Sequence, residues 1–129
     1  RTLIDTMPGE GAIGLVLSTS VRSPIAGLGI SNGLRPGLAM VAKDMADEFG
    51  PRGIRVFGMM PGRIATDRMR ELDGSMGTNA RSEAIAAIPL GRYGDPAEFG
   101  RTAAFLLSPV CGYVTGSVIP IDGGALRSL

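Results

Sequence analysis

The 129-residue sequence has no histidine and no tryptophan, and its one cysteine is Cys111. Without histidine, serine–histidine hydrolysis is excluded, and so is a zinc site of the usual kind, because histidine and cysteine are its common ligands. A single cysteine cannot form an internal disulfide, so we expect Cys111 to be a small core residue in a reducing compartment. We therefore predict no metal site and set the hydrolase and metalloenzyme classes aside.

Neither charge nor hydrophobicity points to a nucleic acid or a membrane. The 13 basic and 12 acidic residues give a net charge of +1, which offers no electrostatic basis for binding nucleic acid or acidic lipid. No apolar run approaches the roughly 20 residues that cross a bilayer, and no basic-then-apolar leader follows Arg1. We expect a cytoplasmic protein whose partner is a small-molecule substrate, with no nucleic acid and no membrane.

What the sequence does contain is an alternation of short apolar runs and helical segments. The runs at 13–17, 54–60 and 118–121 predict three strands buried on both faces. Helical patterns predict a helix tail at 1–7, one long helix up to residue 49, one or two short helices within 66–88, and a helix from 95 to about 107. This order predicts an α/β fold with a parallel sheet and helices on both faces.

Two local patterns fix helix details. Leu34, Leu38, Val41, Met45 and Phe49 recur at steps of four, three, four and four, which predicts that they form one apolar face of the long helix. At the next helix, Asp95-Pro96-Ala97-Glu98 predicts a capping box with proline at the first helical position.

A literal G-x-G-x-x-G occurs at residues 9–14, but we do not interpret it as a dinucleotide fingerprint. That mechanism needs a strand before the glycines and a helix after them, so that the helix N-terminus faces the pyrophosphate. Here a helix tail precedes the glycines and a predicted strand follows them. The segment is predicted to be a turn.

The spacing of Ser18, Ser31 and Arg35, followed by Pro61-Gly62 and a C-terminal Thr115-Gly116 to Asp122-Gly123-Gly124 motif, resembles the second half of a short-chain dehydrogenase/reductase. The likeness is greatest to the 3-oxoacyl-acyl-carrier-protein reductase type. It implies the C-terminal portion of a Rossmann-type doubly wound parallel sheet, with residues 1–129 as one domain that lacks the N-terminal nucleotide-binding half. It also implies an oxidoreductase of carbonyl or alcohol substrates that uses NAD or NADP. The apolar stripe from Leu34 to Phe49, the apolar C-terminal strand and the open edge of the first strand predict a homo-oligomer, a dimer or tetramer.

The resemblance also assigns site residues. Ser18 matches the serine that binds the substrate carbonyl, while Ser31 and Arg35 stand where the family has its catalytic tyrosine and lysine. A serine hydroxyl is a weaker acid than a phenol, and arginine does not titrate near neutrality. The loop residues matching the family's cofactor contacts are Pro61, Gly62, Ile64 and Thr66, with the Ile64 backbone at the nicotinamide amide and the Thr66 hydroxyl near the phosphates.

Other interpretations of these residues stay open. Ser20 could take the role of Ser18; Ser31 could cap the long helix with help from Asn32; and Arg35 could be a solvated first-turn residue. Thr66 could be a helix N-cap. The replaced tyrosine and lysine also allow a catalytically silent binding or scaffold subunit.

The segment 67–88 is expected to form a lid over the substrate. Its apolar members, Met69, Leu72, Met76 and Ile85, weakly favour an apolar ligand.

Overall fold

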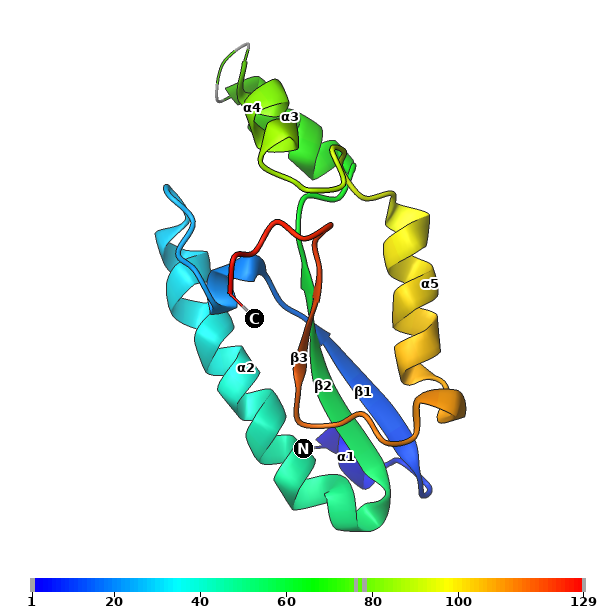
Figure 1. Cartoon of the computed structure of the whole chain (residues 1–129). Helices are drawn as coiled ribbons and strands as arrows, with labels where there is room; N and C mark the ends of the chain where they lie inside the picture. The colour runs from blue at the N-terminus through cyan, green and yellow to red at the C-terminus, as the bar shows by residue number, and fades with distance from the viewer. Residues whose placement is uncertain (1, 76, 78, 129) are drawn as a thin grey trace.

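In the computed structural model, which describes residues 2–75, 77 and 79–128, three parallel strands form one sheet in the order β1-β2-β3 (Figure 1). The strands are β1 (Gly11–Val16), β2 (Ile54–Pro61) and β3 (Val118–Ile121). Ile13 of β1 lies opposite Val56, and Met59 lies opposite Ile119 of β3. The third strand has the predicted bounds, while the first begins two residues earlier and ends one residue earlier than the apolar run.

Helices cover both faces of this sheet, which confirms the α/β fold class. The helices are α1 (Thr2–Asp5), α2 (Gly29–Phe49), α3 (Asp67–Ser75), α4 (Ala80–Ala86) and α5 (Pro96–Leu107), with 3₁₀ turns η1 (Thr19–Val21), η2 (Gly50–Arg52) and η3 (Pro109–Cys111). Apolar residues of α1 and α2 pack on one face, where Ile54 and Val56 point, and α5 packs on the other, against Phe57 and Met59. We call the sheet with α2 and α5 the body.

The central strand β2 forms the core. Its side chains Ile54, Val56, Phe57 and Met60 are completely buried, and Cys111 joins Phe57 in one cluster as a small core residue. The prediction that all strands are buried on both faces is wrong for β1 and β3. The residues of β1 are half-buried with Val16 52% exposed, and in β3 Pro120 is exposed while the other three residues are half-buried. For β1 the reason is that it pairs only with β2 among the described residues, which leaves its outer edge open.

The long helix α2 packs on the sheet through small residues. Its buried side chains are Ala39, Ala42, Ala46 and Phe49. Of the predicted apolar face, Leu34, Leu38 and Val41 are 64%, 42% and 47% exposed. The small alanines allow the helix backbone to approach the sheet closely. Leu34, Leu38 and Val41 therefore lie beside the helix–sheet contact and not within it.

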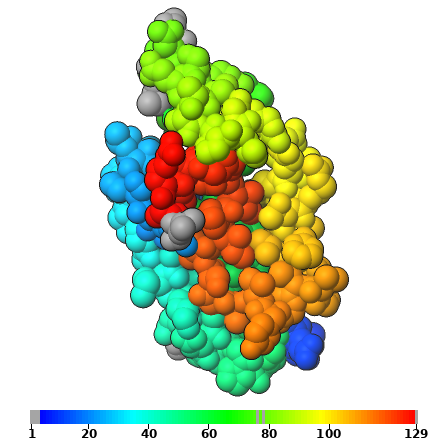
Figure 2. Space-filling view, viewed as in Figure 1, coloured from blue at the N-terminus to red at the C-terminus, as the bar shows by residue number. Residues whose placement is uncertain are grey.

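Residues 65–93, which carry α3 and α4, project from the body at the end of the sheet where the strands finish (Figures 1 and 2). We call this segment the lobe. One or two short helices were predicted within 66–88, and the structure has two there, α3 and α4. Next to the lobe, α5 begins with the predicted capping box: Asp95 Oδ1 accepts the Ala97 N–H at 2.7 Å, and Glu98 accepts the Asp95 N–H at 2.8 Å.

The other end of α5 is closed by a residue that the sequence pattern did not single out. The Arg55 guanidinium donates hydrogen bonds to the carbonyl oxygens of Leu106, Leu107, Ser108 and Val114 at 2.9–3.2 Å. These bonds satisfy carbonyl groups that a helix C-terminus leaves without intrahelical partners. Within the described part of the chain, no helix is long and apolar enough to cross a membrane.

Candidate functional site

The candidate site lies at the carboxyl ends of β1 and β2, where open parallel sheets bind their ligands. Ser18 follows β1 by two residues and caps η1, its Oγ accepting the Ser20 N–H at 3.2 Å. The loop 61–66 leaves β2 at the same edge, and the N-terminal half of α2 lies beside it (Figure 1). The chain thus brings three separate segments to one place.

A cavity of about 390 Å³ lies between this edge and the lobe. Ser18, Pro61 and Gly62 line it from the body, and Met69 and Leu72 line it from α3. Ile85 of the expected lid does not line it, although Ala84, Ala87 and Ile88 do. Met76, the remaining lid residue named from the sequence, lies outside the described residues. The cavity therefore combines polar residues of the body, Ser18, Thr19 and Arg63, with a largely apolar wall from α3 and α4.

Ser31 and Arg35 face a neighbouring hollow of about 420 Å³ rather than the Ser18 cavity; Leu28 lines both. The interpretation of Ser31 as the N-cap of α2 is wrong, because the helix begins at Gly29 with Leu28 at its N-cap. The Ser31 hydroxyl instead lies 3.2 Å from the Ser20 hydroxyl.

Arg35 is not a free, solvated residue either. Its Nη1 donates to the Val16 carbonyl oxygen at 2.6 Å, at the end of the open edge of β1. Ser20, the alternative to Ser18, is 4% exposed and does not line the cavity. Ser20 lies between Ser18 and Ser31: its N–H donates to the Ser18 hydroxyl, and its own hydroxyl contacts the Ser31 hydroxyl.

The four loop residues named as cofactor contacts have separate surroundings. Gly62 is required by packing, since a Cβ there would lie 2.7 Å from the Asp122 Cα. Ile64 forms a parallel bridge with Gly94 and lines a different hollow. Thr66 is exposed and its Oγ1 accepts the Met69 N–H at 3.3 Å, which confirms its interpretation as the cap of α3. Only Pro61 and Gly62 share the cavity with Ser18.

Asn32 contributes in a way that the sequence did not indicate. Its Oδ1 accepts the Ile25 N–H at 3.0 Å and its Nδ2 donates to the Ile25 carbonyl at 2.9 Å. This pairing fixes the loop before α2 against the helix, and Ile25 and Leu28 of that loop line the cavity. An isolated asparagine near a helix start is typical of a cap, so the sequence carried no signal for this role.

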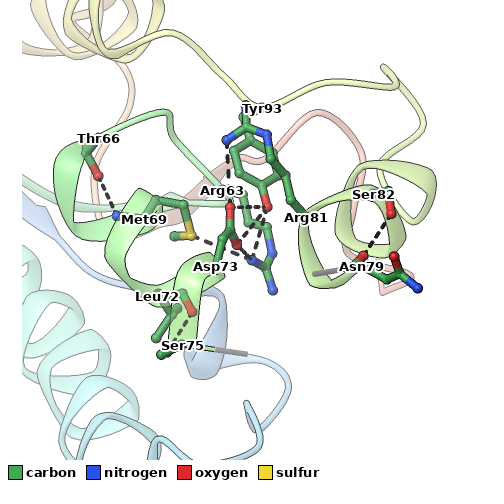
Figure 3. Close-up of polar contacts among 10 residues, drawn as sticks. All are labelled: Arg63, Thr66, Met69, Leu72, Asp73, Ser75, Asn79, Arg81, Ser82 and Tyr93. Atoms are coloured by element: carbon green, nitrogen blue, oxygen red, sulfur yellow. Dashed lines mark hydrogen bonds and ion pairs between the residues drawn. The ribbon is translucent and has the colours of Figure 1, made fainter. Parts of the chain in front are cut away.

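A buried polar cluster in the lobe was also missed (Figure 3). Asp73 is 7% exposed and accepts hydrogen bonds from Arg63 Nη1 at 2.9 Å and from the Tyr93 hydroxyl at 3.0 Å to each carboxylate oxygen. Arg81 Nη1 lies 3.8 Å from Asp73, and its guanidinium lies over the Tyr93 ring at 4.8 Å. Asp73, Arg63 and Tyr93 are far apart in the sequence, so no spacing rule could have joined them.

Neither tyrosine replaces the absent family tyrosine. Burial, and then the hydrogen bond to Asp73, raise the pKa of Tyr93, so its proton is held even more firmly than in water. Tyr93 does not line the Ser18 cavity. Tyr113 is fully exposed and follows η3, at the end of the sheet where β1 and β2 begin. A proton donor with a phenol's acidity is therefore absent from the described walls of this cavity.

The comparisons with known proteins identify the family. Residues 1–125 match the family model described as enoyl-(acyl carrier protein) reductase, and the chain belongs to the short-chain dehydrogenase/reductase family. Levodione reductase of Leifsonia aquatica is 35% identical over 122 residues, which are 89% of this chain and 46% of that protein. The 3-oxoacyl-(acyl-carrier-protein) reductase of Thermotoga maritima is 41% identical over 90 residues, covering 70% of this chain and 35% of the relative.

Solved structures agree with the fold. The NADPH-dependent reductase YwfH, involved in bacilysin biosynthesis, gives a TM-score of 0.87 at 28% identity, covering 91% of this chain and 47% of that one. A short-chain oxidoreductase of Pseudomonas aeruginosa PAO1, solved with NADPH and containing an atypical catalytic center, gives a TM-score of 0.81 at 32% identity over 92% of this chain and 47% of that one. The chain thus spans about half the length of these relatives and has the Rossmann-type fold of the family.

Proposed function

We propose that this chain forms the substrate half of an NAD(P)-dependent oxidoreductase site that acts on a carbonyl or alcohol group attached to an apolar body. The observation that carries the proposal is the cavity in which Ser18 and the Pro61-Gly62 turn lie beneath Met69 and Leu72. A hydroxyl at a strand end can orient a carbonyl, and the apolar roof fits a hydrocarbon substituent. Ser18 already accepts one backbone N–H, and its own proton can be donated to a carbonyl oxygen.

In this proposal Ser31 and Arg35 replace the tyrosine and lysine of typical family members. Reduction of a carbonyl needs a proton at the oxygen as hydride arrives, and a donor of suitable pKa contributes about 10²–10⁴-fold. The Ser31 hydroxyl is a poor donor at neutral pH, and the always-charged Arg35 cannot relay a proton. The internal contacts of Ser31 with Ser20, and of Arg35 with the Val16 carbonyl, support a weakened proton-transfer step.

The cofactor proposed is NAD or NADP, which supplies or accepts the hydride when bound. The backbone at Ile64 would meet its nicotinamide amide, and the Thr66 hydroxyl would lie near its phosphates. Among the described residues, however, no strand leads through a G-x-G-x-x-G loop into a helix; the glycines at 9–14 come after α1 and continue into β1. We therefore expect this chain alone to bind NADH and NADPH weakly. Titration calorimetry with each cofactor tests this, and a low-micromolar dissociation constant would contradict it.

Binding of a simple substrate analogue tests the site itself. Ethyl acetoacetate should shift the NMR resonances of residues 18–19, 61–63 and 69–72, and Ser18→Ala should weaken its affinity by about fivefold or more because a hydrogen bond to the carbonyl is lost. Ser82→Ala, which removes an exposed hydroxyl of α4, is the matched control and should leave affinity unchanged. If ethyl acetoacetate binds the Ser18→Ala chain as well as the unmodified chain, the carbonyl does not lie at Ser18.

For a form of the protein that carries a nucleotide-binding half, the proposal predicts poor turnover that is restored by two changes together. Ser31→Tyr with Arg35→Lys should raise NAD(P)H oxidation by more than the product of the single changes, since the two residues act as a unit. Turnover near the common enzyme value of about 10 per second without any change would contradict the proposal.

A second candidate function is a catalytically silent subunit of a homo-oligomer. The exposed apolar residues of α2, with Ile30, Leu34 and Met40 at 81%, 64% and 70% exposure, favour it, because soluble monomers rarely leave such a stripe uncovered. We propose that a second copy covers this stripe in a dimer or tetramer. Light scattering should show association that Leu34→Asp weakens, and a stable monomer at high concentration would contradict it. Oligomerisation without acetoacetate binding would favour the silent subunit.

A further inference from the structure

The lobe is attached to the body by a narrow neck. Chain segments 63–65 and 94 run side by side there: the Gly94 N–H donates to the Arg63 carbonyl at 2.9 Å, and the Ala65 N–H donates to the Gly94 carbonyl at 2.8 Å. Gly94 allows this approach, since a Cβ would lie 2.8 Å from the Ile64 side chain. The 65–93 segment is thus closed at its base by a pair of backbone hydrogen bonds.

Both limbs of this neck reach the same carboxylate. Arg63 lies on the outgoing limb and Tyr93 precedes Gly94 on the returning limb, and both donate to Asp73 of α3 (Figure 3). Arg63 Nη1 also lies 3.3 Å from the Tyr93 hydroxyl, so the three side chains form a closed set of contacts. Arg81 brings α4 to the same point through its contacts with Asp73 and the Tyr93 ring.

The lobe also contacts the body at two exposed points: the Leu90 N–H donates to the Gly123 carbonyl at 3.3 Å, and the Arg92 guanidinium donates to Glu98 of α5 at 2.7 Å. Among its described residues only Asp73, Ile88 and Tyr93 are buried, so the lobe has no apolar core of its own. Every buried side-chain polar atom in the described part of the chain has a hydrogen-bond partner, which includes both oxygens of Asp73. Hydrogen bonds to a buried charge depend on direction and distance, so this cluster sets the orientation of the lobe more sharply than apolar contact would.

The orientation of the lobe determines the shape of the Ser18 cavity. Met69 and Leu72 precede Asp73 on α3 and form part of the cavity wall opposite Ser18. Asp73 does not itself line the cavity. Its partner Arg63 does line the cavity, so a change at Asp73 reaches the cavity through Arg63 as well as through the position of α3 and α4.

We propose that Asp73 is a positioning residue: by binding Arg63 and Tyr93 it holds the lobe over Ser18 and sets the affinity for the apolar part of the ligand. The effect on ligand affinity rests on the proposed function, which places the ligand in this cavity. The hold on the lobe does not rest on it. The two parts can therefore be tested separately on the same chain.

Hydrogen exchange of the unliganded chain tests the hold on the lobe. Asp73→Ala should raise the exchange of α3 and α4 amides by about tenfold or more while β2 amides stay within about twofold, because only the lobe loses its attachment. Tyr93→Phe keeps the ring beneath Arg81 and should give a smaller, still local increase. Asp67→Asn is the matched control on the same helix, where Asp67 is exposed and pairs with Arg70, and should change nothing. Unchanged protection in α3 and α4, or an equal loss in β2, would overturn the proposal.

Affinity for esters of different length tests the effect on the ligand. Asp73→Ala should weaken hexyl acetoacetate by about fivefold or more and ethyl acetoacetate by less than about twofold, because only the longer ester needs the lobe wall. Asp73→Asn, which keeps the acceptor for Tyr93, should recover part of the loss. Equal weakening of both esters, or of neither, would overturn the positioning role. If neither ester binds the unmodified chain, the proposed function fails, and the exchange result alone decides whether Asp73 holds the lobe.

Discussion

The body and the lobe are held in place by different kinds of interaction. In the body, β2 alone contributes four completely buried apolar side chains, from Ile54 to Met60, and helices close over both faces. In the lobe, a buried carboxylate with two cations and a phenol around it takes the place of such a core. Apolar burial is non-directional and stabilises a whole layer, whereas the Asp73 cluster fixes one geometry at one point.

The comparison teaches where movement can occur without unfolding. Local unfolding costs least free energy in regions with few buried apolar contacts. The lobe is such a region, and the body is not. The cavity with Ser18 lies at the junction, so one wall belongs to the more stable part and the other to the less stable part. The following predictions test this division, from the largest expected effect to the smallest.

Removing core volume from the body should unfold both parts together. Phe57→Ala deletes a completely buried ring packed against Met59 and Leu106, and we expect the free energy of unfolding to fall by about 3–5 kcal/mol. Urea unfolding followed by circular dichroism measures this. Val110→Ala, at an 83% exposed site, is the control and should change stability by less than about 0.5 kcal/mol. A loss below 1 kcal/mol at Phe57 would show that the body does not depend on this core.

The junction should tolerate little change in volume. In Gly62→Ala the new Cβ would lie 2.7 Å from backbone and side-chain carbons of Asp122, so we expect a cost of about 1–3 kcal/mol from overpacking. Gly37→Ala in α2 is the matched control, because no atom lies within 4 Å of its Cβ position and alanine is the better helix former by up to ~1 kcal/mol. Thermal unfolding of the two variants should therefore shift in opposite directions, and a shift in the same direction would contradict the contact with Asp122.

The start of α5 should affect the body but not the lobe. Asp95→Ala removes the capping bond to the Ala97 N–H and should cost about 1 kcal/mol. Hydrogen exchange should increase in the first turn of α5, while α3 and α4 keep their protection through Asp73 and the neck. Exchange rising throughout the lobe would mean that the cap, and not the Asp73 cluster, holds it.

The smallest effect concerns pH at the solvent-exposed side of the neck. Arg92 donates to both carboxylate oxygens of Glu98 at 2.7 Å, and this contact, followed by the Asp95 N–H, lowers the pKa of Glu98 from 4.5 to about 2. Because the folded-state pKa is depressed, the contribution to stability is complete above about pH 4.5 and is lost as the pH falls through about 2.

Glu98→Gln should therefore flatten the dependence of stability on pH within that window. Glu71→Gln, at an exposed residue 3.7 Å from Arg68, should leave the dependence as it is. Urea unfolding at a series of pH values between 2 and 5 checks both variants. An unchanged slope in Glu98→Gln would show that this pair does not link folding to protonation.

The order of strands and helices could be predicted because it depends on local pattern. The continuous apolar runs at 54–60 and 118–121 predicted β2 and β3. Asp95-Pro96 predicted the start of α5, because a helix cap depends only on residues close in sequence. The resemblance assigned Ser18 and Pro61-Gly62 to one site, and they line one cavity because the carboxyl ends of parallel strands share one edge of the sheet.

Contacts between distant segments were decided by the tertiary structure. Nothing local says that Ala39, Ala42 and Ala46 would bury while Leu34 stays exposed, because that depends on how closely the helix approaches the sheet. The resemblance matched Ser31 and Arg35 to the family's tyrosine and lysine. Their contacts with the Ser20 hydroxyl and the Val16 carbonyl form only when the start of α2 lies beside η1 and the end of β1. The Asp73 cluster joins residues 63, 73, 81 and 93, and only a folded neck can bring their charges and hydroxyl to one buried point.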